Sequence, residues 1–225
     1  APITNIAKTK DYDVVVIGAG AAGVITALAA TDNGATVGVL QKASRVYSHG
    51  ILFGSFNAPS VVAATGISWS DEQIVELKRE FQQLTNYACQ TDLLNKYFDN
   101  VAEAMEWHIQ HGIAVNQPHM FNKNGVSVMW LNQVSQLNAA LAEVAQKQGA
   151  TFHFGTPAVQ LVINSSGAVT GAIGKDTDGS YIQLNAKKGV VIATGAYGGN
   201  KELLARWCPD ATIFKNGAYP EDNTG

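Results

Sequence analysis

The clearest chemical signal is a run of glycines near the N-terminus, Gly18-Ala19-Gly20-Ala21-Ala22-Gly23. Its G-x-G-x-x-G spacing is typical of loops that bind the phosphates of a dinucleotide. Gly18 allows a tight turn, Gly20 lets the backbone approach a pyrophosphate, and Gly23 lets the next helix pack close to the preceding strand. The N-terminus of that helix attracts the phosphate charge. The run therefore predicts dinucleotide binding, and the alternative is a glycine-rich turn that binds nothing.

A second position of interest is Gln41, at the end of a short apolar segment about 20 residues after the glycine run. Dinucleotide-binding folds usually place an acidic residue there, which binds the ribose hydroxyls. The amide oxygen of glutamine accepts the same hydrogen bond without charge assistance, so we expect a weaker ribose contact. Lys42, the next residue, leaves a 2′-phosphate and hence NADP open as an alternative.

Other residues that could do chemistry are better explained by structural roles. His108 and His111 have a spacing that a metal ion can use, but a histidine near a helix end is favoured by the helix dipole. Cys89 and Cys208 lie far apart and indicate neither a zinc site nor a disulfide framework. We expect no metal site. No arrangement of serine, histidine and acid, and no carboxylate pair, indicates hydrolysis.

The glycine run needs a strand before it and a helix after it. Residues 13–17 form a β-branched run that predicts a buried strand, residues 21–31 predict a helix, and residues 36–40 predict a second strand. Residues 44–66 show no periodicity and predict a long functional loop. Three helices are expected to form an insertion after this loop, at about residues 70–84, 92–111 and 132–148.

The C-terminal part changes to a strand pattern. A β-meander is predicted from strands at residues 151–154, 159–164, 169–175 and 181–184, and a buried strand at residues 189–195, ending in glycine, closes it. The alternation of strands and helices predicts an α/β fold: a Rossmann-like parallel sheet with a β-meander and a helical insertion. The first 12 residues are polar and are expected to form an N-terminal arm.

The overall composition excludes several classes of partner. The 225 residues carry a net charge of −3, and only 15% of them are charged. This charge indicates binding neither to nucleic acid nor to an anionic membrane surface. No apolar run reaches the roughly 18 residues of a membrane span, so none is expected. The chain begins with Ala1, which predicts a processed or trimmed N-terminus and leaves cytoplasmic and exported locations open.

Three segments together resemble a known family. The strand and glycine run of residues 13–23, the segment Phe53-Gly54-Ser55-Phe56-Asn57 and residues 190–200 are similar to the FAD-binding flavoprotein family of fumarate reductase and succinate dehydrogenase. This family includes urocanate reductases and ketosteroid dehydrogenases. The resemblance covers about residues 11–225 and implies a sheet of the glutathione-reductase type. It favours FAD as the cofactor and specifies no substrate.

The resemblance also implies which residues contact FAD. The loop of residues 44–57 would run beside the isoalloxazine ring, Ala158 would lie near the adenine, and Thr194 and Gly195 would flank the pyrophosphate. The full set of expected FAD-binding residues is Gly18, Ala19, Gly20, Ala21, Ala22, Gly23, Gln41, Lys42, Ala43, Ser48, His49, Gly50, Phe53, Gly54, Ser55, Ala158, Thr194 and Gly195.

His49 raises the question of a covalent flavin. In the membrane-complex members of the resembled family, a Ser-His pair in this loop bears the flavin covalently, and Ser48-His49 stands at that place. The run from His49 to Gly54 is one residue shorter here, and soluble members bind FAD without a covalent bond. We therefore expect non-covalent FAD, with a covalent link to His49 as the alternative.

The resemblance also predicts a capping domain that lies outside residues 1–225. The expected FAD-binding domain covers residues 13–225, with its insertion at about residues 67–149, and the capping domain that holds the proton donor would come from a second chain or a further C-terminal portion. No catalytic residue is assigned. The favoured activity is reduction of the activated C=C bond of a small unsaturated acid of the fumarate or urocanate type, with electrons from a donor protein or domain. The alternatives are a ketosteroid 1,2-dehydrogenase and an electron-transfer module without a substrate site.

Overall fold

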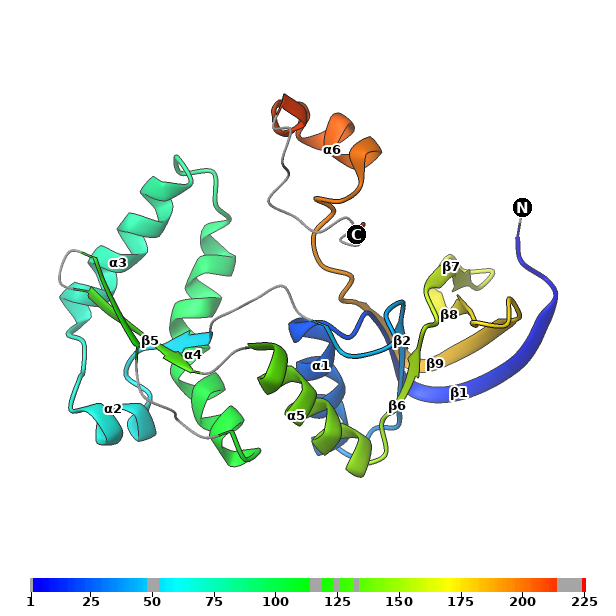
Figure 1. The fold of residues 1–225 in the computed structure, drawn as a ribbon, viewed down its shortest axis with the longest axis horizontal. Helices are drawn as coiled ribbons and strands as arrows, with labels where there is room; N and C mark the ends of the chain where they lie inside the picture. The colour runs from blue at the N-terminus through cyan, green and yellow to red at the C-terminus, as the bar shows by residue number, and fades with distance from the viewer. Residues whose placement is uncertain (1, 48–52, 114–118, 124–125, 132–133, 214–223) are drawn as a thin grey trace. The chain divides into compact units, whose positions relative to one another are not determined.

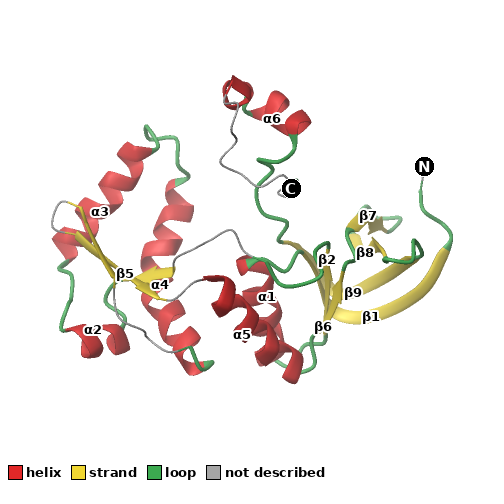
Figure 2. Ribbon diagram, in the orientation of Figure 1, coloured by secondary structure: helices red, strands yellow, loops and turns green. Residues whose placement is uncertain are grey.

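The computed structural model describes residues 2–47, 53–113, 119–123, 126–131, 134–213 and 224–225. These residues divide into two compact units, one of residues 1–48 and 141–225 and the other of residues 49–140. Each unit has its own sheet and helices (Figures 1 and 2). No helix within these ranges combines the length and the apolar character needed to cross a membrane.

The first unit is built on a six-stranded sheet with the strand order β6-β2-β1-β9-β8-β7. Four neighbouring strands are parallel, and β7 and β8 form an antiparallel meander with β9 (Figure 2). The strands are β1 (Ile6–Ile17), β2 (Val37–Gln41), β6 (Thr151–Phe154), β7 (Ala158–Ile163), β8 (Val169–Lys175) and β9 (Tyr181–Ile192). The helices of this unit are α1 (Ala21–Asp32), α6 (Lys201–Trp207), the 3-10 turn η1 (Pro209–Ile213) and the C-terminal half of α5 (Val134–Lys147). The predicted α/β fold is confirmed.

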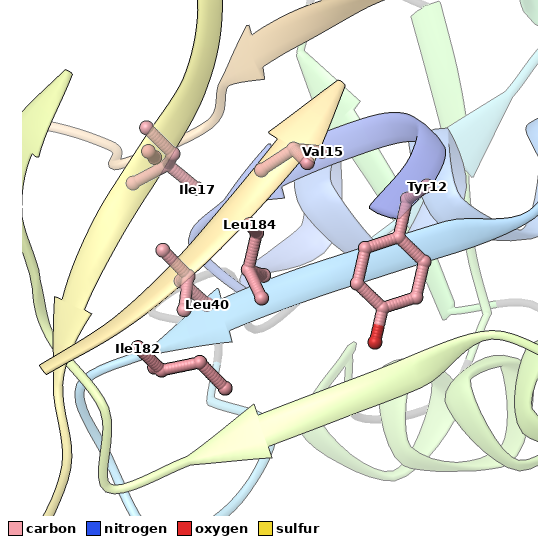
Figure 3. Packing of buried hydrophobic residues seen from close by; sticks show 7 residues of the cluster. Tyr12, Val15, Ile17, Leu40, Ile182 and Leu184 are labelled. Atoms are coloured by element: carbon pink, nitrogen blue, oxygen red, sulfur yellow. The ribbon is translucent and has the colours of Figure 1, made fainter. Parts of the chain in front are cut away.

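The two faces of this sheet pack differently. Val15 and Ile17 point into a cluster with Leu40, Ile182 and Leu184 (Figure 3), in which Tyr12 and Ala172 also take part. Because side chains alternate along a strand, the residues between them point to the other face, where α1 contacts β1 and β2. Burial on both faces explains why these strands are rich in valine, isoleucine and leucine.

Several predicted boundaries in the first unit are wrong. Residues 6–12, expected in the N-terminal arm, extend β1 and pair with β9, and residues 181–192 form one strand instead of two. Residues 151–154 form a strand as predicted, but it lies outside the meander. This strand, β6, pairs in parallel with β2 at the opposite edge, because the helix α5 precedes it and carries the chain across the sheet.

The second unit contains helices and a small antiparallel sheet. Its helices are α2 (Pro59–Thr65), α3 (Asp71–Leu84), α4 (Thr91–Gln110) and the first half of α5, and its strands are β3 (Phe53–Ser55), β4 (His119–Lys123) and β5 (Val126–Leu131). Ser70 and Gln73 form the capping box that begins α3. Phe56, Trp69 and Phe98 centre its apolar core. The long loop predicted at residues 44–66 is wrong in part, since β3 and α2 lie within it.

Candidate dinucleotide site

Three parallel strands end together at the glycine turn. The backbone N–H of Gly18 donates to the carbonyl oxygen of Leu40, the last but one residue of β2, at 2.8 Å. The N–H of Ala193, which follows β9, donates to the carbonyl oxygen of Ile17 at 2.8 Å. The carboxyl ends of β1, β2 and β9 are thereby fixed side by side, which is where open parallel sheets bind their ligands.

The three glycines of the motif are required for different reasons. Gly18 has a φ of +101°, and a Cβ atom there would lie 2.5 Å from the carbonyl oxygen of Ala193. A Cβ atom at Gly23 would overlap the carbonyl oxygen of Gly18. Gly20, in contrast, has an ordinary φ of −79°, and its nearest neighbour would be the carbonyl oxygen of Tyr47 at 3.5 Å. The packing of the chain therefore requires Gly18 and Gly23 but leaves the space beside Gly20 open for a ligand.

The helix α1 begins directly after Gly20, the position with open space beside it. Gly20 is its N-cap residue, so no side chain caps the first turn, and that turn contains no acidic residue. The first amides of a helix have no partner within the helix and carry partial positive charge. Backbone at Gly20 and the amides of Ala21 and Ala22 can thus bind a pyrophosphate, and this part of the site fits a dinucleotide.

A pocket of about 140 Å³ lies beside the turn, at the carboxyl ends of the strands. Most of its wall is apolar or small, as suits an adenine ring, and Lys42 carries the one charged side chain among the described residues of that wall. The lining residues are Ile17, Gly18, Leu40, Gln41, Lys42, Pro157, Ala158, Thr194, Thr224 and Gly225.

Gln41 lies in the pocket wall, but its side chain is bonded differently from the prediction. Only 7% of the residue is exposed. Its Oε1 accepts a hydrogen bond from the backbone N–H of Ala19, and its Nε2 donates to the carbonyl oxygen of Arg45, both at 3.1 Å. Both ends of the amide therefore have backbone partners within the protein, and the ribose contact stays a prediction.

The residues after Gln41 form one rim of the pocket. The exposed Nζ of Lys42 donates to Oγ1 of Thr224 at 3.1 Å. The carbonyl oxygen of Ala43 accepts a hydrogen bond from the N–H of Gly155 at 2.9 Å, which fixes this segment to the end of β6. Lys42 can therefore reach a ligand in the pocket, whereas Ala43 lies beside it as a structural support.

The structure thus brings together the predicted residues of the first unit. Gly18 of the glycine run, Gln41 and Lys42 line the pocket together with Ala158, at the start of β7, and Thr194, after β9. Gly195 follows with a φ of +81°, which turns the chain away from the strand. Sequence reasoning missed Ile17, Leu40, Pro157, Thr224 and Gly225. Ile17 and Leu40 could have been found from their places at strand ends, whereas no spacing signals the contribution of residues 224 and 225.

The predicted flavin-ring residues lie apart from this set. Ser48, His49 and Gly50 are outside the described residues, and of Phe53 and Gly54 the structure describes the backbone only, in β3. Ser55 belongs to the second unit, is fully buried, and donates from Oγ to the carbonyl oxygen of Val101 on α4 at 3.2 Å. Its hydroxyl therefore joins β3 to α4, and its contact with FAD stays a prediction.

Groups of three or more histidine, cysteine or acidic residues that could hold a metal ion do not occur in the described parts of the chain. His108 and His111, the one pair with suitable spacing, each place Nδ1 at a backbone carbonyl oxygen four residues earlier on α4. Burial, above all, lowers the pKa of His108.

Comparison with known proteins identifies the family. Residues 13–218 match the family model described as FAD binding domain. The vinyl phenol reductase of Lactiplantibacillus plantarum is 26% identical over 210 residues, which are 90% of this chain and 41% of that protein. The urocanate reductase of Eggerthella lenta is 26% identical over 208 residues, which are 90% of this chain and 34% of that protein. The chain thus spans well under half the length of these curated relatives.

Solved structures agree on the fold. The 3-ketosteroid-Δ4-(5α)-dehydrogenase from Rhodococcus jostii superimposes with a TM-score of 0.80 at 21% identity, over 98% of this chain and 53% of that chain. A flavocytochrome c3 fumarate reductase gives a TM-score of 0.75 at 24% identity, over 93% of this chain and 37% of that chain. The expected resemblance to the fumarate reductase flavoproteins is confirmed. The chain belongs to the FAD binding domain family, and its cofactor is FAD.

Proposed function

We propose that the protein is an FAD-dependent oxidoreductase that reduces the activated C=C bond of an unsaturated carboxylic acid of the fumarate or urocanate type. The observation that carries FAD binding is the open backbone at Gly20, at the uncapped N-terminus of α1. The reaction is supported by the relatives, which are named as reductases of vinyl phenol, fumarate and urocanate. Each of these three compounds contains a carbon–carbon double bond conjugated to an electron-withdrawing or aromatic group.

In this proposal the reduced form of FAD would supply the hydride from its N5 atom, and the chain holds the ADP half of the cofactor. The turn at Gly20 and the first amides of α1 bind the pyrophosphate, and the wall around Leu40 and Ala158 encloses the adenosine. Fixing one end of the cofactor positions the other end for hydride transfer. The proton donor and the groups that bind the substrate come from a further domain or chain, since the relatives extend well beyond the matched region.

Reoxidation of the reduced protein tests this proposal. The intact protein, with the further domain or chain, is reduced with reduced methyl viologen in the absence of oxygen. It is then mixed with fumarate, urocanate, vinyl phenol or a 3-ketosteroid. We expect an unsaturated acid to restore the flavin absorbance at 450 nm and the matching saturated acid to be formed. Succinate, which lacks the double bond, is the control. Reoxidation by neither fumarate nor urocanate would contradict the proposal.

Two other functions are distinguished by the same assay. A ketosteroid 1,2-dehydrogenase would reduce flavin when given the saturated steroid ring and would be indifferent to fumarate. An electron-transfer module would exchange electrons with the dye and with none of the carbon compounds. The fold likeness to a ketosteroid dehydrogenase does not favour the first of these, because at 21% identity it concerns architecture alone.

We further propose that FAD is bound without a covalent link to His49. The support is the shorter run between His49 and Gly54 and the reductive direction, which gains nothing from the higher flavin potential that a covalent bond confers. Acid precipitation is expected to leave the yellow cofactor in the supernatant. A coloured pellet, with the protein mass raised by one FAD, would favour the covalent alternative.

A further inference from the structure

The side-chain amide of Gln41 connects two parts of the FAD pocket that are not joined by any strand pairing. One is the glycine turn, through the N–H of Ala19, and the other is the segment that follows β2, through the carbonyl oxygen of Arg45. That segment then returns over the turn, where the N–H of Tyr47 donates to the carbonyl oxygen of Ala19 at 3.3 Å. The backbone of Gln41 is fixed by a further hydrogen bond, in which its carbonyl oxygen accepts from the N–H of Thr156 at 2.8 Å.

We propose that Gln41 is a positioning residue for FAD and not the ligand of its ribose. Its amide holds the glycine turn and residues 42–47 at the separation that the adenosine and pyrophosphate require. The inference rests on FAD binding by this family and not on the proposed reduction of an unsaturated acid.

The bonding pattern explains why a neutral amide stands where these folds usually have an acid. The position needs one acceptor, toward Ala19, and one donor, toward Arg45. A carboxylate offers acceptors only, so its second oxygen would face the carbonyl oxygen of Arg45 and repel it. A protonated carboxyl group has one donor and one acceptor and would restore the pattern.

Few charged groups lie near enough to alter the ionisation of a carboxyl group at position 41. Among the described residues of the pocket wall, Lys42 carries the one charged side chain, and its ammonium group is exposed on the rim with Thr224. The side chain of Arg45 is exposed as well. From β1, the glycine turn and the connection between β6 and β7, the pocket wall receives only uncharged residues. A glutamic acid buried at position 41 would therefore resist ionisation, because burial disfavours the charged form.

The test is the pH dependence of FAD affinity in Gln41→Glu. Apoprotein is titrated with FAD between pH 5 and pH 8, and each affinity is expressed relative to the wild-type protein at the same pH. We expect the variant to bind FAD about tenfold more weakly at pH 8, the effect of one buried hydrogen bond lost and one repulsion gained, and to approach the wild type at pH 5. Tighter binding at pH 8 would overturn the inference and show that the side chain serves the ribose directly.

Two further variants separate positioning from general loss of stability. Gln41→Leu, which keeps the volume and removes both hydrogen bonds, is expected to weaken FAD binding by a similar factor at every pH. Wild-type affinity in this variant would overturn the inference, and circular dichroism of the apoprotein verifies that each variant is folded.

Gln148→Glu is the matched control, because the amide of Gln148 also bridges a donor and an acceptor, away from the pocket wall. It accepts from Oγ1 of Thr31 at 2.6 Å and donates to Oδ1 of Asp32 at 3.0 Å. The control variant should leave FAD affinity unchanged from pH 5 to pH 8. A pH-dependent loss equal to that of Gln41→Glu would overturn the inference by showing a general effect of the added acid. Failure of the wild-type protein to bind FAD would instead contradict the cofactor assignment, on which the inference rests.

Discussion

The glycine motif shows what single residues contribute to this site. Its spacing predicted a different role for each of the three glycines, and their contacts in the structure distinguish them as well. Gly18 and Gly23 are required by contacts of the chain with itself, at Ala193 and at the turn. Among the described residues, the atom nearest to a Cβ at Gly20 would be the carbonyl oxygen of Tyr47, at 3.5 Å. Substitutions at the motif should therefore separate folding from cofactor binding.

We expect Gly20→Val to abolish FAD retention and leave the apoprotein folded. The valine methyl groups would occupy the place of the pyrophosphate, while the ordinary φ of Gly20 accepts a side chain without strain. The flavin-to-protein absorbance ratio after gel filtration measures retention, and a urea melt measures the stability of the apoprotein.

The comparison variant is Gly23→Ala, in which the added methyl overlaps the carbonyl oxygen of Gly18. It should destabilise the apoprotein by about 1–3 kcal/mol, the usual cost of overpacking. Full flavin occupancy in Gly20→Val would mean that the motif serves folding alone.

We expect His153 to make the first unit sensitive to acid. Its Nε2 lies 3.2 Å from Oη of Tyr12, and burial, followed by the charge of Lys10, lowers its pKa from the ordinary 6.5, against an opposing effect of Asp176. A histidine with a lowered pKa binds its proton more readily in the unfolded chain. Stability is therefore expected to be constant above about pH 6.5 and to fall as the pH drops below it.

Replacing His153 with glutamine should reduce this acid sensitivity. Urea unfolding at pH 8 and pH 5 is expected to show a smaller loss of stability in His153→Gln than in the wild type. Some loss will remain, because burial also lowers the pKa of His108 in the second unit. Equal losses in both proteins would show that His153 does not contribute.

At the scale of elements, the sequence predicted those strands and helices that are determined by residues close to them in sequence. The strand of residues 169–175 and the helix beginning at Ser70 are confirmed, since turn residues and capping groups define them locally. Residues 6–12 and 185–188 were not predicted as strand, because polar and charged side chains interrupt the apolar pattern there. Residues 6–12 pair with residues 181–186 of β9, and no local signal reveals this long-range pairing.

A close approach between two of these strands gives a test of the fold. A Cβ atom at Gly38, in β2, would overlap the ring of Tyr12, which packs across it from β1. We expect Gly38→Ala to destabilise the first unit by about 1–3 kcal/mol. The control is Gly189→Ala in β9, where no described residue beyond the chain neighbours comes within 4 Å of the added methyl. Its effect should stay within about 0.5 kcal/mol. Equal effects in urea melts would contradict the packing described for Tyr12.

At the scale of the whole molecule, the structure brings together several residues predicted for the ADP end of the site, whereas those predicted for the flavin end lie apart or outside the described residues. The ADP end depends on one turn and the ends of parallel strands, which a motif and a strand pattern can indicate together. The flavin end was predicted from the resemblance around residues 44–57, part of which falls in the second unit and part outside the described residues. The pairing of Gln41 with Ala19 and Arg45 was beyond prediction, because it depends on side-chain orientation and not on spacing.

The long pairing of β1 with β9 also has a consequence for synthesis. Ile6 pairs with Tyr181 and Ile17 with Ile192, so the first strand made is completed only by residues about 175 positions later. At roughly 5–20 residues per second, a ribosome needs about 10–35 s to supply them. During that interval β1 has no partner strand on the side that β9 will occupy. An unpaired strand edge can associate with other chains. The nascent protein is thus expected to depend on chaperones more than its finished fold would suggest.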